Sequence, residues 1–306
     1  MSVFVYHAHD VGLTLVGPLS DHGNLGVSVF FALSGYLVYR PFLRRPVEPV
    51  GYMLRRTLRV APAWLVAVIG VRLLIPAQGP LLVLVMWSLF VELSFYAVLP
   101  LLARAARGRE LPVVGGLGLA SFVLSLVAPS MAVPVAAMPA MLPIFFWCFA
   151  LGMLLAIVER DRPAFIRSRA WIAGGLPSIG LGLLIADRYP SGYGDPWTDL
   201  LVVLGAVVVM GGLIDLRRNW AWTALAADAT YSFYLWHYPV MNSLSLVLAP
   251  ALGVALGFLI AGAISVATTV VLERPIRTFV DLRQRARAER STASIPVPAF
   301  IPVPEY

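Results

Sequence analysis

The chain has 306 residues, of which 59% are hydrophobic and only 13% are charged. A soluble domain of this length needs more charge on its surface, so the composition excludes an ordinary soluble protein and points to a membrane protein. The net charge of +7 comes from arginine without any lysine, and the arginines sit beside apolar stretches, which favours membrane topology over nucleic-acid binding.

Apolar stretches long enough to cross a bilayer recur along the whole sequence. A transmembrane helix needs about 20 predominantly apolar residues. We therefore predict an all-α, polytopic membrane helix bundle with about ten transmembrane helices. The expected spans are residues 1–18, 26–43, 60–76, 81–103, 111–129, 139–158, 170–187, 198–215, 230–248 and 251–272.

The arginines predict the orientation of this bundle. If both termini are cytoplasmic, 21 of the 23 arginines fall in or beside cytoplasmic segments, and only Arg72 and Arg188 lie near the outer face. We expect a transmembrane domain over residues 1–275 in the inner (cytoplasmic) cell membrane. Residues 276–306 are expected to form a basic cytoplasmic tail that is partly disordered, because the sequence becomes Pro-rich toward its end.

The first expected span contains the stretch "VYHAHD", residues 5–10. At about 100° per residue, His7 and His9 fall on opposite faces of a helix, so the pair does not suit a metal site, and we expect no metal. His7 and Asp10 share a face, where the carboxylate can orient one imidazole nitrogen and leave the other as a general base. The alternative is a hydrated histidine and aspartate at the membrane interface.

The second expected span contains Ser34 and Gly35 in its middle. Small residues at such a place permit two helices to pack closely, and we favour that interpretation. A nucleophilic serine is the weaker hypothesis, because the G-x-S-x-G pattern of a nucleophile elbow is absent from this stretch.

Three arginines cluster before the third expected span, in the loop "GYMLRRTLRVAP". Arg56 and Arg59 are three residues apart, so both guanidinium groups can point to one side, and Arg55 is adjacent. Guanidinium clusters bind phosphate groups through paired hydrogen bonds. The alternative is ordinary cytoplasmic arginine that only sets the topology.

Two later spans carry ionisable residues that are costly in a bilayer. Glu92 lies in "WSLFVELSFYAVLP" between Trp87 and Tyr96, and we expect it to have an arginine or histidine partner on another helix. His237 lies in "YSFYLWHYPV", just before the kink-forming Pro239. The alternative for His237 is a hydrogen-bonded member of an aromatic interface belt.

Taken in order, these stretches resemble the bacterial acyltransferase family 3, the integral-membrane O-acyltransferases. The resemblance extends over nearly the whole chain, and the similarity of six motifs in sequence order makes it specific. The motifs are "VFVYHA", "GVSVFFALSGYLVYR", "RRTLRVAPAW", "WSLFVELSFYAVLPLL", "ATYSFYLWHYPV" and "LERPIR".

The resemblance implies transfer of a short acyl group from cytoplasmic acyl-coenzyme A to a hydroxyl. The expected donor is acetyl-coenzyme A, which is a substrate, and no permanently bound cofactor is expected. The expected acceptor is a hydroxylated glycan, a glycolipid or an antibiotic such as a macrolide. The lipid bilayer is the other expected partner, and nucleic acid is not expected to be one.

The resemblance also assigns roles to individual residues. It implies that His7 is catalytic and that Arg56 and Arg59 engage the acyl donor, while the role of Asp10 as orienting partner of His7 comes from their helix spacing. We expect Glu92 to orient an arginine or the acceptor. The other candidates are Arg55, His237, Ser34, Tyr96 and Trp87.

The chain departs from the family pattern in two places. Members of the family usually carry an arginine about ten residues before the histidine, whereas only six residues precede His7 here, and the 24 residues between Pro62 and Trp87 are fewer than in most members.

A rival hypothesis is a multi-pass transporter of a small solute with His7, Glu92 and His237 as a proton relay. Such a protein would favour paired broken helices in two related halves, and the sequence has no visible internal symmetry of that kind.

Overall fold

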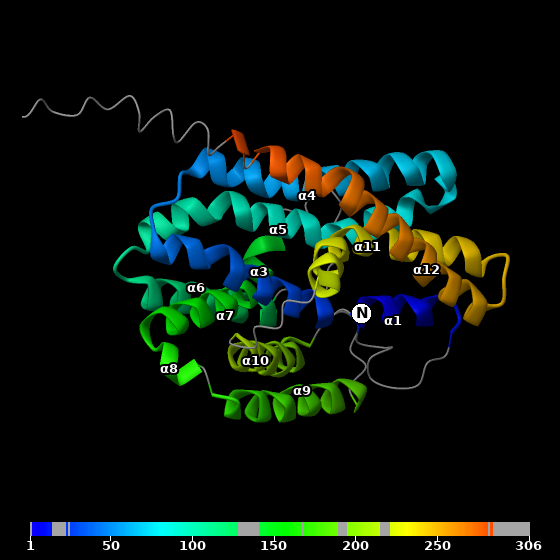
Figure 1. The fold of residues 1–306 in the computed structure, drawn as a ribbon. Coiled ribbons are helices and arrows are strands. Elements are labelled where there is room, and N and C mark those ends of the chain that lie inside the picture. The colour runs from blue at the N-terminus through cyan, green and yellow to red at the C-terminus, as the bar shows by residue number, and fades with distance from the viewer. Residues whose placement is uncertain are drawn as a thin grey trace, which may run out of the picture.

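The computed structural model describes residues 2–13, 23, 25–127, 141–166, 168–188, 195–214, 221–280 and 282–283. These residues form helices and turns and contain no strand, so the predicted all-α fold is confirmed. Figure 1 shows α4 and α5 along one side of the bundle and α9 along the other. The elements are α1 (Ser2–Asp10), α3 (Leu25–Arg44), α4 (Pro49–Leu74), η1 (Pro76–Gln78), α5 (Gly79–Ala105), α6 (Glu110–Val127), α7 (Leu142–Asp161), α8 (Pro163–Ile166), α9 (Ala170–Arg188), α10 (Pro196–Leu213), α11 (Ala221–Ser245), α12 (Pro250–Thr268) and η3 (Thr269–Glu273).

Seven helices in the described part of the chain are long and apolar enough to cross a membrane. The polytopic membrane bundle is therefore confirmed, while the number of ten spans and the side on which the termini lie stay predictions. These seven segments are Leu25–Arg44, Pro49–Leu74, Val85–Ala105, Glu110–Val127, Leu142–Asp161, Pro196–Leu213 and Pro250–Val280.

The first helix is shorter than the sequence predicts. It ends at Asp10, and Gly12 follows with φ at +91°, a left-handed conformation that glycine adopts easily and that commonly ends a helix. Nine residues rise only about 14 Å, less than half of a hydrocarbon core of about 30 Å. The predicted continuous helix over residues 1–18 is thus wrong at residues 11–13, which form a turn, and its part over residues 14–18 lies outside the described residues.

Helix α4 begins at Pro49, well before residue 60, where the sequence predicts the third span to start. The Glu48 side chain caps its first turn by accepting hydrogen bonds from the backbone N–H groups of Val50, at 2.8 Å, and Gly51. Proline is also favourable in the first turn. The arginine cluster that we expected in a loop therefore lies on α4.

The centre of the bundle is a close crossing of α3 and α7. Gly35 lies directly against the backbone of Phe149, and Gly152 lies against the backbone of Ala32. Phe31 stacks on Phe149 beside the crossing, with ring centroids 4.7 Å apart. The small-residue notch predicted in this span is confirmed, because Gly35 is where the two backbones approach each other.

Helices α11 and α12 form an antiparallel pair whose alignment is fixed by two glycines. Gly257 contacts Met241, and Gly253 contacts Ser245. His237, four residues before Met241, is therefore level with Ala261. After α12 the chain continues through the π-helical η3 and remains helical to Val280.

Charged helix ends gather at one end of the bundle. Arg40 at the end of α3 pairs with Glu159 at the end of α7, at 2.5 Å. Arg160 lies 3.7 Å from Glu110 at the start of α6. This arrangement agrees with the sequence expectation that these arginine-bearing segments share one side of the membrane.

Candidate active site

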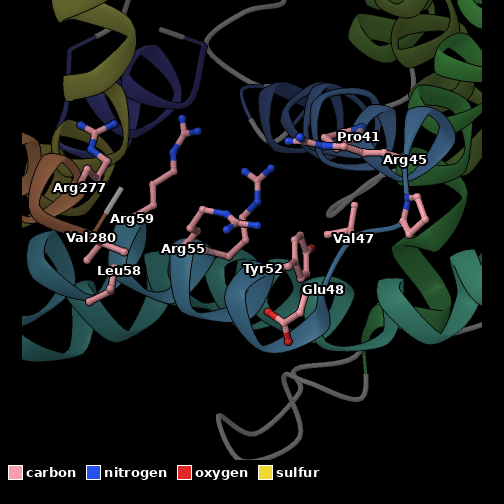
Figure 2. A pocket seen from close by; sticks show the side chains of 12 residues that line it. Pro41, Arg45, Val47, Glu48, Tyr52, Arg55, Leu58, Arg59, Arg277 and Val280 are labelled. Carbon is pink, nitrogen blue, oxygen red and sulfur yellow. The ribbon is translucent and has the colours of Figure 1, made fainter. Parts of the chain in front are cut away.

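A cavity of about 530 Å³ opens between the end of α3, the start of α4 and the helical segment after η3. We call it the arginine cavity. Figure 2 shows Arg55 and Arg59 projecting from α4 to the same side, with Arg277 beside Arg59 and Arg45 at the opposite edge. The five arginines that line it are Arg45, Arg55, Arg56, Arg59 and Arg277.

The lining of the arginine cavity carries more positive than negative charge, although Arg277 is also paired with Asp228 at 3.0 Å. Glu48 is the one carboxylate among its 12 lining residues, and both of its oxygens accept backbone hydrogen bonds at the start of α4. Apolar side chains such as Leu58 and Val280 complete the walls. Several guanidinium groups around a half-apolar space suit an organic polyanion, because each guanidinium can bind a phosphate through two parallel hydrogen bonds.

A second polar group, here called the Glu92 group, consists of Ser34, Glu92 and Tyr96. The Ser34 hydroxyl donates to Glu92 Oε1 at 3.0 Å, and the Tyr96 hydroxyl donates to the same oxygen. Glu92 is only 4% exposed. Hydroxyl groups, and no arginine or histidine among the described residues, donate hydrogen bonds to this carboxylate, while Arg59 and Arg56 of α4 act on it at electrostatic range.

A third polar group, the histidine group, lies where α1 meets α11. His7 Nδ1 is 2.9 Å from Asp10 Oδ2, so the two side chains that their spacing puts on one face are in contact. The His7 ring stacks on Tyr238, with centroids 3.9 Å apart and an interplanar angle of 14°. Because Nδ1–H donates to the carboxylate, the neutral imidazole presents Nε2 as a proton acceptor.

His237 is the second imidazole of the histidine group. Its ring centroid is 5.3 Å from that of His7, and its side chain is almost completely buried. Nδ1 lies 2.6 Å from the carbonyl oxygen of Tyr234 and donates to it, which leaves Nε2 as a buried acceptor without a hydrogen-bond partner. A buried acceptor of this kind is unusual, and the rings of Phe4 and Phe233 lie 6.3 and 6.0 Å from that of His237.

The three polar groups lie at different depths in the bundle. His237 is level with Ala261, and the 16 residues from Ala261 to Arg277 rise about 24 Å. Tyr231, within electrostatic range of both Glu92 and Tyr234, lies between the levels of His237 and the arginine cavity. The end of α1 faces the opposite end of the bundle, because Gly12 approaches Pro250 at the start of α12.

Two other residues discussed from the sequence lie outside these groups, the candidate Trp87 and the neighbouring histidine His9. His9 is exposed on α1, as its opposite face predicts. Trp87 packs in an aromatic cluster with Phe31 and Phe145, at centroid distances of 6.1 and 5.2 Å. Trp87 therefore contacts the α3–α7 core.

Sequence reasoning missed three residues that the fold brings to these groups. Arg45 and Arg277 line the arginine cavity, and Tyr238 stacks on His7. Two of them stood in recognisable motifs, since Arg277 ends "LERPIR" and Tyr238 follows His237 directly. Arg45 carried no signal beyond its charge.

The sequence is similar to a known protein family and to membrane-associated proteins of two bacteria. Residues 1–274 match a protein family described as an acyltransferase domain. The exopolysaccharide production protein ExoZ of Rhizobium meliloti strain 1021 is 28% identical over 320 residues, which covers 89% of this chain and 93% of ExoZ. BcsY of Komagataeibacter xylinus, named as a membrane-bound transacylase, is 28% identical over 263 residues, or 71% of this chain and 66% of BcsY. No solved structure matches the chain.

Proposed function

The chain belongs to acyltransferase family 3, a family of membrane acyltransferases, and from this premise we propose that it transfers an acetyl group from acetyl-coenzyme A to a hydroxyl of a glycan or glycolipid. The observation that carries the proposal is the arginine cavity, whose five arginines favour a donor with several phosphate groups. The protein is a multi-pass membrane enzyme, and we assign it to the inner membrane with the arginine cavity on the cytoplasmic side.

The depth of the histidine group supports a long donor. An anion bound near Arg277 lies about 24 Å, measured along the bundle axis, from the level of His237. Coenzyme A combines a phosphate-rich nucleotide with an extended arm that ends in the thioester. A compact donor such as an acyl phosphate lacks an arm that would reach from Arg59 toward His7.

His7 is the proposed general base. Its Nε2 accepts the proton of the acceptor hydroxyl while that oxygen attacks the thioester carbonyl. A C–O bond forms, the C–S bond breaks, and the departing thiolate takes the proton from His7 to give coenzyme A. Asp10 holds the imidazole in the tautomer that this step needs. The histidine needs no covalent acyl-enzyme for this reaction.

The acceptor is proposed to be a sugar hydroxyl. ExoZ is named for exopolysaccharide production, which favours a glycan over an antibiotic acceptor. The end of α1 beside Pro250 is opposite to the end that carries the arginine cavity, which supports donor and acceptor entry from the two sides of the membrane.

The proposal is tested with membranes that contain the full chain, labelled acetyl-coenzyme A and a hydroxylated exopolysaccharide. We expect label to appear in the glycan at a rate proportional to the amount of protein. A transporter would move solute without consuming the thioester, so label that remains entirely on coenzyme A with every glycan and glycolipid offered would contradict the proposal.

Arg59→Ala is expected to raise the KM for acetyl-coenzyme A about 10- to 100-fold, the effect of losing one charge-assisted contact to a phosphate. The change in kcat should be smaller, because Arg59 lies far from the histidine group. Arg72→Ala is the matched control, since Arg72 is exposed on the other end of α4. Equal KM values for the two variants would remove Arg59 from the donor site.

Asp10→Asn is expected to lower kcat about 10-fold while the KM for the donor stays the same. The carboxylate fixes the His7 tautomer, but it is one-third exposed, so water partly replaces it and the effect stays modest. Steady-state rates with labelled donor provide the measurement. A rise in donor KM at constant kcat would contradict the assignment of Asp10 to His7.

A further inference from the structure

We propose that Glu92 is a positioning residue that acts through Tyr96 to hold the Arg56 guanidinium in the arginine cavity. The inference rests on the proposed use of that cavity by an acyl-coenzyme A donor. It gives Glu92 a role that is separate from the acceptor and from the transfer of the proton.

Arg56 differs from the other two arginines of its cluster. Its guanidinium carbon is 5.8 Å from the ring centroid of Tyr52 and 5.5 Å from that of Tyr96, both within the range of a cation–π interaction. Arg56 is half-buried, whereas Arg55 and Arg59 are exposed. Two aromatic rings therefore restrict where the Arg56 side chain can lie.

The two rings are themselves fixed by their neighbours. Phe42 packs edge-on against Tyr52, at 5.1 Å and 78°. The Tyr96 hydroxyl donates to Glu92, which also accepts from Ser34. Both tyrosines are only 4% exposed, so their rings have little room to rotate away. The position of Arg56 thus depends on the Glu92 group, whose hydrogen bonds hold the Tyr96 ring in place.

This arrangement has a consequence for donor binding. Glu92 is absent from the lining of the arginine cavity, so its chain of contacts to the donor runs through Tyr96 and Arg56, while Arg59 interacts with it only at electrostatic range. A guanidinium that is held in place before the ligand arrives loses less side-chain freedom on binding than a free one. The planar group also keeps its N–H donors for the phosphate, because the ring faces accept no conventional hydrogen bond from them.

The experiment compares tyrosine and glutamate variants of the full chain in detergent. Titration with coenzyme A gives the Kd, and labelled acetyl-coenzyme A gives KM and kcat. Tyr96→Leu removes one ring and is expected to raise both the Kd and the donor KM about 2- to 25-fold, with kcat within about twofold of the wild type. Tyr96→Phe keeps the ring and should have a smaller effect.

The Glu92 variants separate positioning from chemistry. Glu92→Gln keeps an oxygen that can accept from Tyr96 and Ser34, so it should retain the wild-type KM and kcat within about threefold. Glu92→Ala should raise the donor KM as Tyr96→Leu does. Adding Tyr96→Leu to Arg56→Ala should cause no further loss, because the ring acts through that arginine.

Distinct outcomes contradict the inference and the proposed function. Tyr96→Leu with a wild-type Kd, or Glu92→Gln with abolished kcat, would overturn the inference alone. Failure of the wild type to bind coenzyme A would overturn both. Should Tyr96→Leu not fold, Arg56→Lys serves instead: it keeps the charge without the planar group and must raise the donor KM, and an unchanged KM contradicts the inference.

Discussion

His7→Ala is expected to lower the rate of acyl transfer by about 10²- to 10⁴-fold, the range of a lost general base. The imidazole is held on two sides, by the Asp10 carboxylate at 2.9 Å and by the Tyr238 ring, so its Nε2 has a fixed direction. Within the described residues, no second imidazole contacts Asp10, because Nδ1 of His237 donates to the Tyr234 carbonyl oxygen instead. Initial rates with labelled acetyl-coenzyme A measure the loss.

His9→Ala is the matched control for this variant. His9 lies on the same short helix but is exposed, so the same substitution should leave the rate unchanged. Coenzyme A binding by the His7 variant should also remain, because the arginine cavity lies at a different depth of the bundle. A transfer rate equal to that of the wild type in His7→Ala, with the variant folded and its amount matched, would contradict the assignment of His7 as the general base.

Gly152→Leu is expected to destabilise the protein by at least about 3 kcal/mol, the upper end of the usual range for overpacking. A Cβ at this position would overlap the backbone carbonyl oxygen of Ala32, so the helices α3 and α7 would have to separate. Separation would also displace Ser34 from Glu92, because Ser34 lies on α3 beside this crossing. The folded fraction that survives heating in detergent is the measurement.

Gly116→Leu provides the comparison for this effect. Gly116 lies in the helix α6, where a Cβ meets no atom within 4 Å. Leucine is a better helix former than glycine, so this variant should be at least as stable as the wild type. Equal heat sensitivity of the two variants would show that the α3–α7 crossing tolerates a larger separation than its geometry indicates.

The arginine cavity is built from distant parts of one chain. Arg45 follows α3, the cluster of Arg55, Arg56 and Arg59 is on α4, and Arg277 comes from the segment after η3. Arg277 also lies 3.0 Å from Asp228 on α11, so the helix that carries His237 is tied to the wall of the cavity. The arginine cavity and the histidine group therefore share structural support.

The sequence by itself determined the features that depend on local periodicity and composition. The apolar content required a helical membrane bundle, because lipid offers no partner for an open backbone. The spacing of His7 and Asp10 put both on one helix face, and the spacing of Arg56 and Arg59, which we expected in a loop, allowed both guanidinium groups to point to one side. The order of the motifs also indicated the family to which residues 1–274 belong.

Only the tertiary structure decided which of these faces meet. The end of α1 at Asp10, the closure of the cavity by Arg45 and Arg277, and the stacking of Tyr238 on His7 all depend on contacts between segments far apart in the chain. Glu92 had no sequence neighbour that identified Ser34 as its partner. Such contacts follow from how closely whole helices pack, which glycines such as Gly35 and Gly152 set and which the period of one helix cannot encode.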